Sequence, residues 1–228
     1  MTFSMTQSEF PKVPVEAPTH RLIPSRFPPV AAFEDVASAA DLADVMELEG
    51  WTNDRLVAER AARLPQTEWA YGRPNASVIM ASFLHTPPSG LRFSGGALGA
   101  WYGALSVETC IAEVSHHLRR EMLRSGAARF VTTYRAYTAR IEGDYSDIRH
   151  RENERPELYA RADYSGSQAF GEATRAEGGD GILYDSLRHR GGTNLCAYRP
   201  SKVQDVTQAG HIELTLRTEG KIVARRLA

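Results

Sequence analysis

The chain has 228 residues, of which 42% are hydrophobic and 24% charged, and its formal net charge at pH 7 is −1. This length supports one sizeable hydrophobic core or at most two small ones, and the balanced charge creates no global field that would draw the chain to nucleic acid or to an anionic membrane. No window approaches the roughly 18 consecutive apolar residues of a membrane span, and the N-terminus has no secretory signal pattern.

The N-terminal part divides into two segments. Residues 1–30 hold six of the twelve prolines, which favours an extended arm that lies over the surface or is partly disordered. Residues 31–68 are expected to form a helical extension, with apolar side chains at helical spacing over 41–48 and a second helix over 54–64. Two strands are then predicted, Ser77–Phe83 and Trp101–Leu105.

A helix is predicted directly after the second strand, with Ser106 as its N-cap. Apolar side chains at helical spacing make a buried stripe on it: Val107, Ile111, Val114, Leu118 and Met122. Glu113 lies at the margin of this stripe, on the same face as Cys110 and His117. A carboxylate at that place is either an ordinary solvated helix glutamate or a partly desolvated charge that has a task or a partner.

The remaining elements complete a mixed set. Phe130–Ile141 is predicted to be a long strand, and residues 143–175, which are polar and rich in Arg, Glu and Tyr, are expected to be loop and helix. Three further strands are predicted: Gly181–Tyr184, Leu195–Tyr198 and His211–Arg217. The simplest fold for this order is a single α+β domain with an N-terminal helical extension.

The stretch GILYDSLRHRGGTNLCAYRP, residues 181–200, carries the most informative pattern. An apolar run stops at Asp185-Ser186, and a basic segment and then Gly191-Gly192-Thr193-Asn194 follow before the next apolar run. A strand that ends in a hydroxyl, cations and an amide-bearing turn can present hydrogen-bond donors to an anionic ligand. Taken alone, Ser186 can equally cap a turn, and the two glycines can be an ordinary hairpin turn.

Together with RFSGGALGAWYGALSVETCIAEVSHH at residues 92–117, this stretch resembles the RES-domain family of NAD-consuming bacterial toxins. The resemblance covers roughly residues 70–200 and implies a fold similar to ADP-ribosyltransferases, with residues 69–228 as the NAD-binding catalytic domain. The family uses an arginine, a tyrosine, a helix glutamate and a serine around NAD. The matching residues stand in the same order and spacing: Arg92, Tyr102, Glu113 and Ser186.

These four residue types suit cleavage of NAD at its nicotinamide–ribose bond. Bond breaking places positive charge on the ribose, which the carboxylate of Glu113 can stabilise. The guanidinium of Arg92 can hold the pyrophosphate bidentately. Tyr102 can stack on nicotinamide or bond the ribose, and Ser186 can fix the ribose or the carboxamide. No metal is required, because nicotinamide is already a good leaving group.

Four more residues are expected to contact NAD: Arg73, His85, Ser94 and Asn194. Ser94 precedes two glycines whose backbone amides can approach phosphate, and Asn194 can fix the ribose or the carboxamide. The family often has a second arginine nearer the N-terminus, for which Arg73 is the nearest candidate. His85 can face the same pocket or be structural. The run Arg92-Phe93-Ser94 departs from the family's GRW-type motif.

The resemblance implies a type II toxin that depletes NAD as a phosphorylase or glycohydrolase, with phosphate or water as the acceptor. Mono-ADP-ribosyl transfer to a protein is a related alternative, and a non-catalytic nucleotide-binding module belongs to a different class. The implied partners are NAD and a separate Xre-type antitoxin that covers the active site. Cys110 and Cys196 form neither a disulfide framework nor a CxxC pair, so we expect a cytoplasmic protein with reduced thiols.

Overall fold

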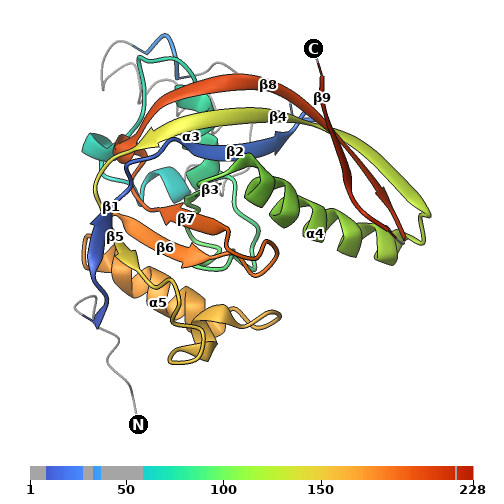
Figure 1. Cartoon of the computed structure of the whole chain (residues 1–228). Helices are drawn as coiled ribbons and strands as arrows, with labels where there is room; N and C mark the ends of the chain where they lie inside the picture. Colours follow the sequence, from blue (N-terminus) through green and yellow to red (C-terminus); the bar gives the residue numbers. More distant parts are fainter. Residues whose placement is uncertain (1–8, 28–32, 37–58, 219, 228) are drawn as a thin grey trace.

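The computed structural model describes residues 9–27, 33–36, 59–218 and 220–227 (Figure 1). Over these ranges the strands form one mixed sheet in the order β1-β5-β6-β7-β3-β2-β4-β8-β9. The strands are β1 (Lys12–Pro14), β2 (Thr19–Pro24), β3 (Trp101–Ala104), β4 (Arg129–Ile141), β5 (Asp144–Asp147), β6 (Gly181–Asp185), β7 (Thr193–Ala197), β8 (Val203–Arg217) and β9 (Val223–Leu227). β5 and β6 run parallel, whereas β6 and β7, like β4 and β8, are antiparallel. The predicted α+β class is confirmed.

Helices cover both faces of this sheet. The described helices are α3 (Ala76–Leu84), α4 (Val107–Ser125) and α5 (Ser165–Ala176), with 3-10 turns η2 (Gln66–Glu68), η3 (Pro156–Tyr159) and η4 (Pro200–Lys202). Side chains alternate along the strands, so Leu183 of β6 and Leu195 of β7 share a core with α3, while Ile182 and Cys196 share another with α5. The same alternation in β4 places α4 on the α5 side of the sheet (Figure 1).

The helix after β3 forms as predicted. The hydroxyl of Ser106 accepts a hydrogen bond from the backbone N–H of Thr109 at 3.2 Å, which caps α4. Met122 is fully buried, and the other stripe residues pack partly buried against the core under β4 and β8. Gly126, with φ of 68°, ends the helix in the left-handed conformation that glycine adopts without strain. α4 is therefore fixed by the packing of its apolar face against the sheet, and Glu113 lies at the margin of that face.

The predicted N-terminal surface arm is wrong for β1 and β2. β2 lies inside the sheet, paired with β4 over its whole length and with β3 at His20. Its prolines sit only at the boundaries, Pro18 before the strand and Pro24 at its end, where a missing N–H does not break a central ladder. The helix predicted over 41–48 and the first five residues of the helix predicted over 54–64 lie outside the described residues. Of the rest of the second helix, residues 59–61 are helical and residues 62–64 form a turn.

The strand predicted over 77–83 is also wrong, because Ala76–Leu84 is helix α3. Met80 and Phe83 are fully buried, and Val78, Ile79, Ser82 and Leu84 are buried too, so the helix is apolar on almost every side. A short apolar run of this kind has no helical periodicity to distinguish it from a buried strand. The strands predicted at 101–105, 130–141, 181–184, 195–198 and 211–217 are confirmed, whereas β5 and β9 were not predicted.

Among the described helices, none is both long enough and apolar enough to cross a membrane. Both cysteines, Cys110 and Cys196, are free thiols and buried.

Candidate active site

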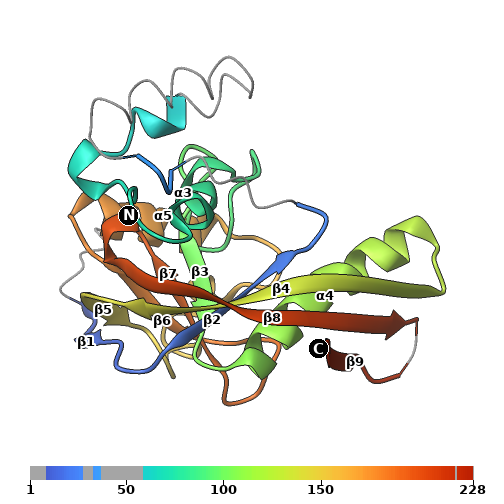
Figure 2. The same ribbon diagram turned by 90° about the horizontal axis from the view of Figure 1, so that it is seen from above.

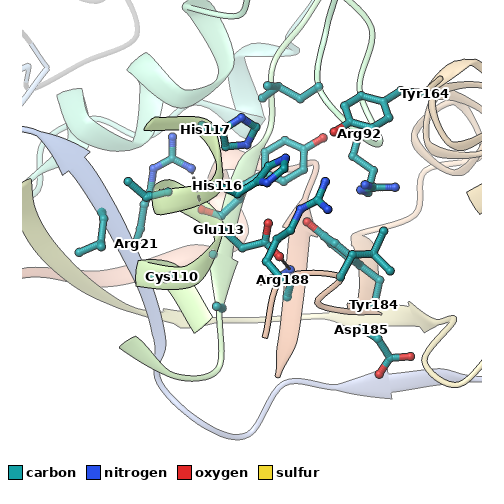
Figure 3. Close-up of a pocket in the computed structure, with 18 residues that line it drawn as sticks. Arg21, Arg92, Cys110, Glu113, His116, His117, Tyr164, Tyr184, Asp185 and Arg188 are labelled. Atoms are coloured by element: carbon teal, nitrogen blue, oxygen red, sulfur yellow. Dashed lines mark hydrogen bonds between the residues drawn. The ribbon is translucent and has the colours of Figure 1, made fainter. Parts of the chain in front are cut away.

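A pocket of about 390 Å³ opens on the face of the sheet that carries α4 and α5 (Figure 3). Its walls come from β2, β3, the middle of α4, the residue before α5 and the loop that follows β6. The volume falls within the range of roughly 300–1,000 Å³ that small-molecule and cofactor sites occupy. Segments distant in sequence therefore meet at one site.

Glu113 of α4 is the centre of a hydrogen-bond network in this pocket. Its Oε1 accepts a hydrogen bond from the Ser186 hydroxyl at 2.6 Å and another from the Asn194 side-chain amide at 2.8 Å. Two donors on one oxygen fix the orientation of the carboxylate. Ser186 and Asn194 stand at the two ends of the turn between β6 and β7, so the GILYDS…GGTN pattern positions the glutamate.

Ser186 also holds its own loop. Its hydroxyl oxygen accepts hydrogen bonds from the backbone N–H groups of Arg188 at 3.1 Å and His189 at 3.0 Å. With those two donors pointing at the oxygen, the hydroxyl proton is directed to Glu113. The sequence left open whether Ser186 caps a turn or belongs to the site. In the structure its hydroxyl does both, because it caps the loop and also contacts Glu113.

Tyr102 of β3 lines the pocket, but its hydroxyl forms hydrogen bonds with the protein. The hydroxyl oxygen accepts a hydrogen bond from Phe93 N–H at 3.0 Å and lies 3.1 Å from the hydroxyl of Ser94. Burial raises the pKa of the Tyr102 hydroxyl well above its ordinary value. Ser94 is fully buried and does not line the pocket. Its hydroxyl contacts Tyr102, and the predicted contact between Ser94 and NAD is therefore wrong.

Two arginines enter the pocket from opposite sides (Figure 3). Arg92 donates to the carbonyl of Ala160 at 2.9 Å, and its guanidinium lies 4.6 Å from the ring centroid of Tyr164. Arg21 of β2 donates to the Tyr102 carbonyl at 2.7 Å and lies over the Trp101 ring. Burial lowers the pKa of Arg21 to about 10, which still leaves the side chain cationic at neutral pH.

Sequence reasoning missed Arg21 and named two residues that the structure places elsewhere. Arg73 bonds the Gln204 side chain and the Pro200 carbonyl, and His85 is an exposed residue at the end of α3. Neither lines the pocket. The available signal for Arg21 was the strand-like run Thr19-His20-Arg21-Leu22, which lies between two prolines in the segment that was predicted to be an arm.

The rim beside Glu113 carries one arginine and two imidazole rings. Arg188 of the loop after β6 and the adjacent histidines of α4, His116 and His117, line the pocket. Loss of water around the rings lowers the pKa of both histidines, and the nearby cations lower it further. Within the described ranges, no cluster of three or more His, Cys, Asp and Glu residues is arranged to hold a metal ion.

Comparison of the sequence with known proteins identifies the family of this chain. A family model described as RES domain matches residues 60–217. The protein y4oC of Sinorhizobium fredii, itself uncharacterized, is 29% identical over 142 residues, which is 60% of this chain and 60% of the length of that protein. A chain from the crystal structure of the M. tuberculosis MbcT–MbcA toxin–antitoxin complex aligns at 21% identity with a TM-score of 0.41, covering 57% of this chain and 74% of that chain. Because the family match spans well over half of the sequence, this chain belongs to the RES-domain family.

Proposed function

We propose that this protein is a toxin of a toxin–antitoxin pair that binds NAD⁺ in the pocket and cleaves its nicotinamide–ribose bond. The observation that carries the proposal is the Glu113 carboxylate, oriented by Ser186 and Asn194 in a pocket that also holds Arg21 and Arg92. An anchored carboxylate among cations suits a ligand with both an anionic pyrophosphate and a site of developing positive charge. NAD⁺ has both.

Glu113 would act on the ribose. Both donors recorded among the described residues bind Oε1, so Oε2 remains able to accept a hydrogen bond from a ribose hydroxyl. When the bond from the ribose carbon to nicotinamide breaks, the bonding electrons leave with nicotinamide, and the ribose gains oxocarbenium character. A carboxylate already held in place stabilises this charge without reorganising during the reaction.

Arg21 and Arg92 would hold the pyrophosphate. Their guanidinium groups are planar forks that match phosphate oxygens bidentately. Each is already fixed, Arg21 between Trp101 and the Tyr102 carbonyl, Arg92 against Tyr164. The tyrosine rings on the pocket wall offer faces on which the nicotinamide or adenine ring can stack.

The toxin role and the antitoxin partner come from the resemblance to the NAD-consuming toxins of the RES-domain family. An Xre-type antitoxin chain that covers the pocket would stop NAD⁺ from reaching Glu113. The acceptor of the ADP-ribosyl group is phosphate, water or a protein side chain, and each leaves a different product.

The test is nicotinamide release from NAD⁺ by the purified protein, measured by chromatography with and without inorganic phosphate. An ADP-ribose phosphate ester, free ADP-ribose or label on protein identifies the acceptor. Glu113→Gln should lower the rate by on the order of 10²-fold or more. Glu108→Gln, an exposed position on the same helix, should leave it unchanged. A folded Glu113→Gln protein with the wild-type rate would refute the assignment.

A further inference from the structure

The far end of the sheet carries a second surface, on the side away from the pocket. β4 and β8 extend beyond the other strands alongside α4, and β9 pairs with the outer edge of β8 (Figure 2). Phe130 and Leu216 pack towards α4. Because strand side chains alternate, their neighbours point to the opposite side. We call this side the outer face; it consists of Arg129, Val131, Thr133, Glu213, Thr215, Arg217, Val223 and Arg225.

The centre of the outer face is apolar and open. Val131 pairs with Thr215, and Thr215 pairs with Val223, so the three side chains form one row across the strands. Val131 is 48% exposed and Val223 is 60% exposed. Single exposed apolar residues are common, but two valines that stand in one row on either side of a threonine, flanked by charges, have the composition of an interaction site.

Positive charge lies beside this row. Arg129 and Arg217 stand directly opposite each other in the β4–β8 register, and both are exposed. Like charges opposite each other destabilise a sheet, and no carboxylate among the described residues pairs with either arginine. On the other side of the row, Arg225 pairs with Glu213 at 3.1 Å. Since the whole chain has a net charge of −1, two neighbouring arginines without a carboxylate partner in the described part of the chain are a local excess of positive charge.

We propose that the outer face docks one acidic amphipathic helix of a second protein. An apolar centre with arginines at its rim is the anatomy of a protein–protein interface. Nucleic acid phosphates would neutralise the arginines but leave the valine row in water. Three strands spaced about 4.8 Å apart span about 10 Å, which is close to the diameter of a single helix. The inference does not depend on NAD cleavage, because the outer face and the pocket lie on opposite sides of the sheet.

The experiment measures fluorescence anisotropy of a labelled 18-residue helical peptide with a leucine stripe flanked by glutamates. The double variant Arg129→Glu/Arg217→Glu should weaken binding at least tenfold, and Val131→Ser/Val223→Ser should weaken it by a similar factor. Two controls should bind like the wild type: Leu123→Ser, an equally exposed apolar residue on α4, and Arg63→Glu, an exposed cation outside the face. All variants should keep the wild-type melting curve.

Several outcomes would overturn the proposal. One is no binding of the peptide to the wild-type protein. Another is unchanged binding in the valine variant together with complete loss in high salt, which would show charge attraction alone. Tighter binding of an 18-base-pair DNA duplex, lost in the arginine variant, would assign the face to nucleic acid. A dimer in sedimentation that the arginine variant abolishes would assign it to a second copy of the chain.

Discussion

Ser186 is the residue on which both the loop after β6 and the orientation of the Glu113 carboxylate depend. It is 8% exposed, accepts two backbone N–H groups and donates to Glu113. Ser186→Ala should therefore lower the free energy of unfolding by roughly 1–3 kcal/mol, since it leaves buried donors without a partner. It should also lower NAD cleavage and the stabilisation given by a non-cleavable NAD analogue.

Melting curves with and without the analogue separate these effects, with Ser89→Ala as an exposed control. Lower stability with unchanged stabilisation by the analogue and unchanged cleavage would make Ser186 a turn cap only. Unchanged stability with weaker stabilisation by the analogue would make it a ligand contact only.

Arg21 and Arg73 give a matched test of the proposed pyrophosphate contact, in which Arg21 is the second arginine beside Arg92. Lysine keeps the charge but loses the fork, so Arg21→Lys should weaken NAD⁺ binding by roughly 1.5–3 kcal/mol. Arg73→Lys should not change it, because Arg73 bonds Gln204 and Pro200 outside the pocket. Calorimetry in a Glu113→Gln background measures binding without turnover. The reverse pattern would move the phosphate site to Arg73.

At this scale the sequence identifies residue types but not their contacts. The resemblance to the RES-domain family indicated Arg92, Tyr102, Glu113 and Ser186, and the polar turn before β7 indicated Asn194. The structure places all five on the pocket or in contact with it. No sequence pattern shows that the Tyr102 hydroxyl is directed to Phe93 and Ser94, because that contact depends on how the turn after Arg92 folds back on β3.

Among the elements, the loop between β6 and β7 is attached to the start of α4. Thr109 Oγ1 lies 2.9 Å from His189 Nδ1, and a Cβ on Gly192 would lie 2.6 Å from that Thr109 oxygen. Gly192→Ala should thus separate the loop from α4 and displace Ser186 from Glu113. We expect NAD cleavage to fall by on the order of 10- to 100-fold, since small displacements at a reacting centre have effects of that size.

The neighbouring glycine provides the control. Gly191 has φ of 76°, and a Cβ there would meet nothing within 4 Å. Gly191→Ala should lower stability by about 1–2 kcal/mol through backbone strain alone and keep the cleavage rate. Equal losses of cleavage in the two variants, measured well below their melting temperatures, would contradict the proposed contact between loop and helix.

Elements with clear periodicity were predictable, and those without it were not. The α4 stripe and the long β4 carry their own signal. α3 is buried on almost every side and carries no charged residue, so its sequence has no polar face to reveal a helix. β9 is exposed along most of its length and is defined by its pairing with β8, which is a tertiary contact.

In the whole molecule, the first strands of the chain join segments far apart in sequence. β2 lies between β3 and β4, and β1 pairs with β5 at an edge of the sheet. Composition could not show this, because the described prolines of this segment, at 11, 14, 18 and 24, stand at or next to the ends of β1 and β2. The N-terminal segment thereby supplies both a central strand of the sheet and Arg21 of the pocket. Both the fold and the pocket therefore require this segment.

Two truncations test that dependence. Removal of residues 1–17 deletes β1, a three-residue edge strand, together with Phe10 of the core. Removal of residues 1–24 also deletes β2, which leaves the ladders of β3 and β4 without their shared partner. Because β1 is an edge strand, the truncation of residues 1–17 should still melt cooperatively, at a lower temperature, and should still cleave NAD. Unpaired backbone groups at the centre of a sheet are costly, so the truncation of residues 1–24 should show no cooperative transition. Full-length Arg21→Lys, which should keep its fold, separates loss of the arginine from loss of the strand. Cooperative melting of the longer truncation, followed by circular dichroism, would show that β2 is dispensable and that the first residues are an arm after all.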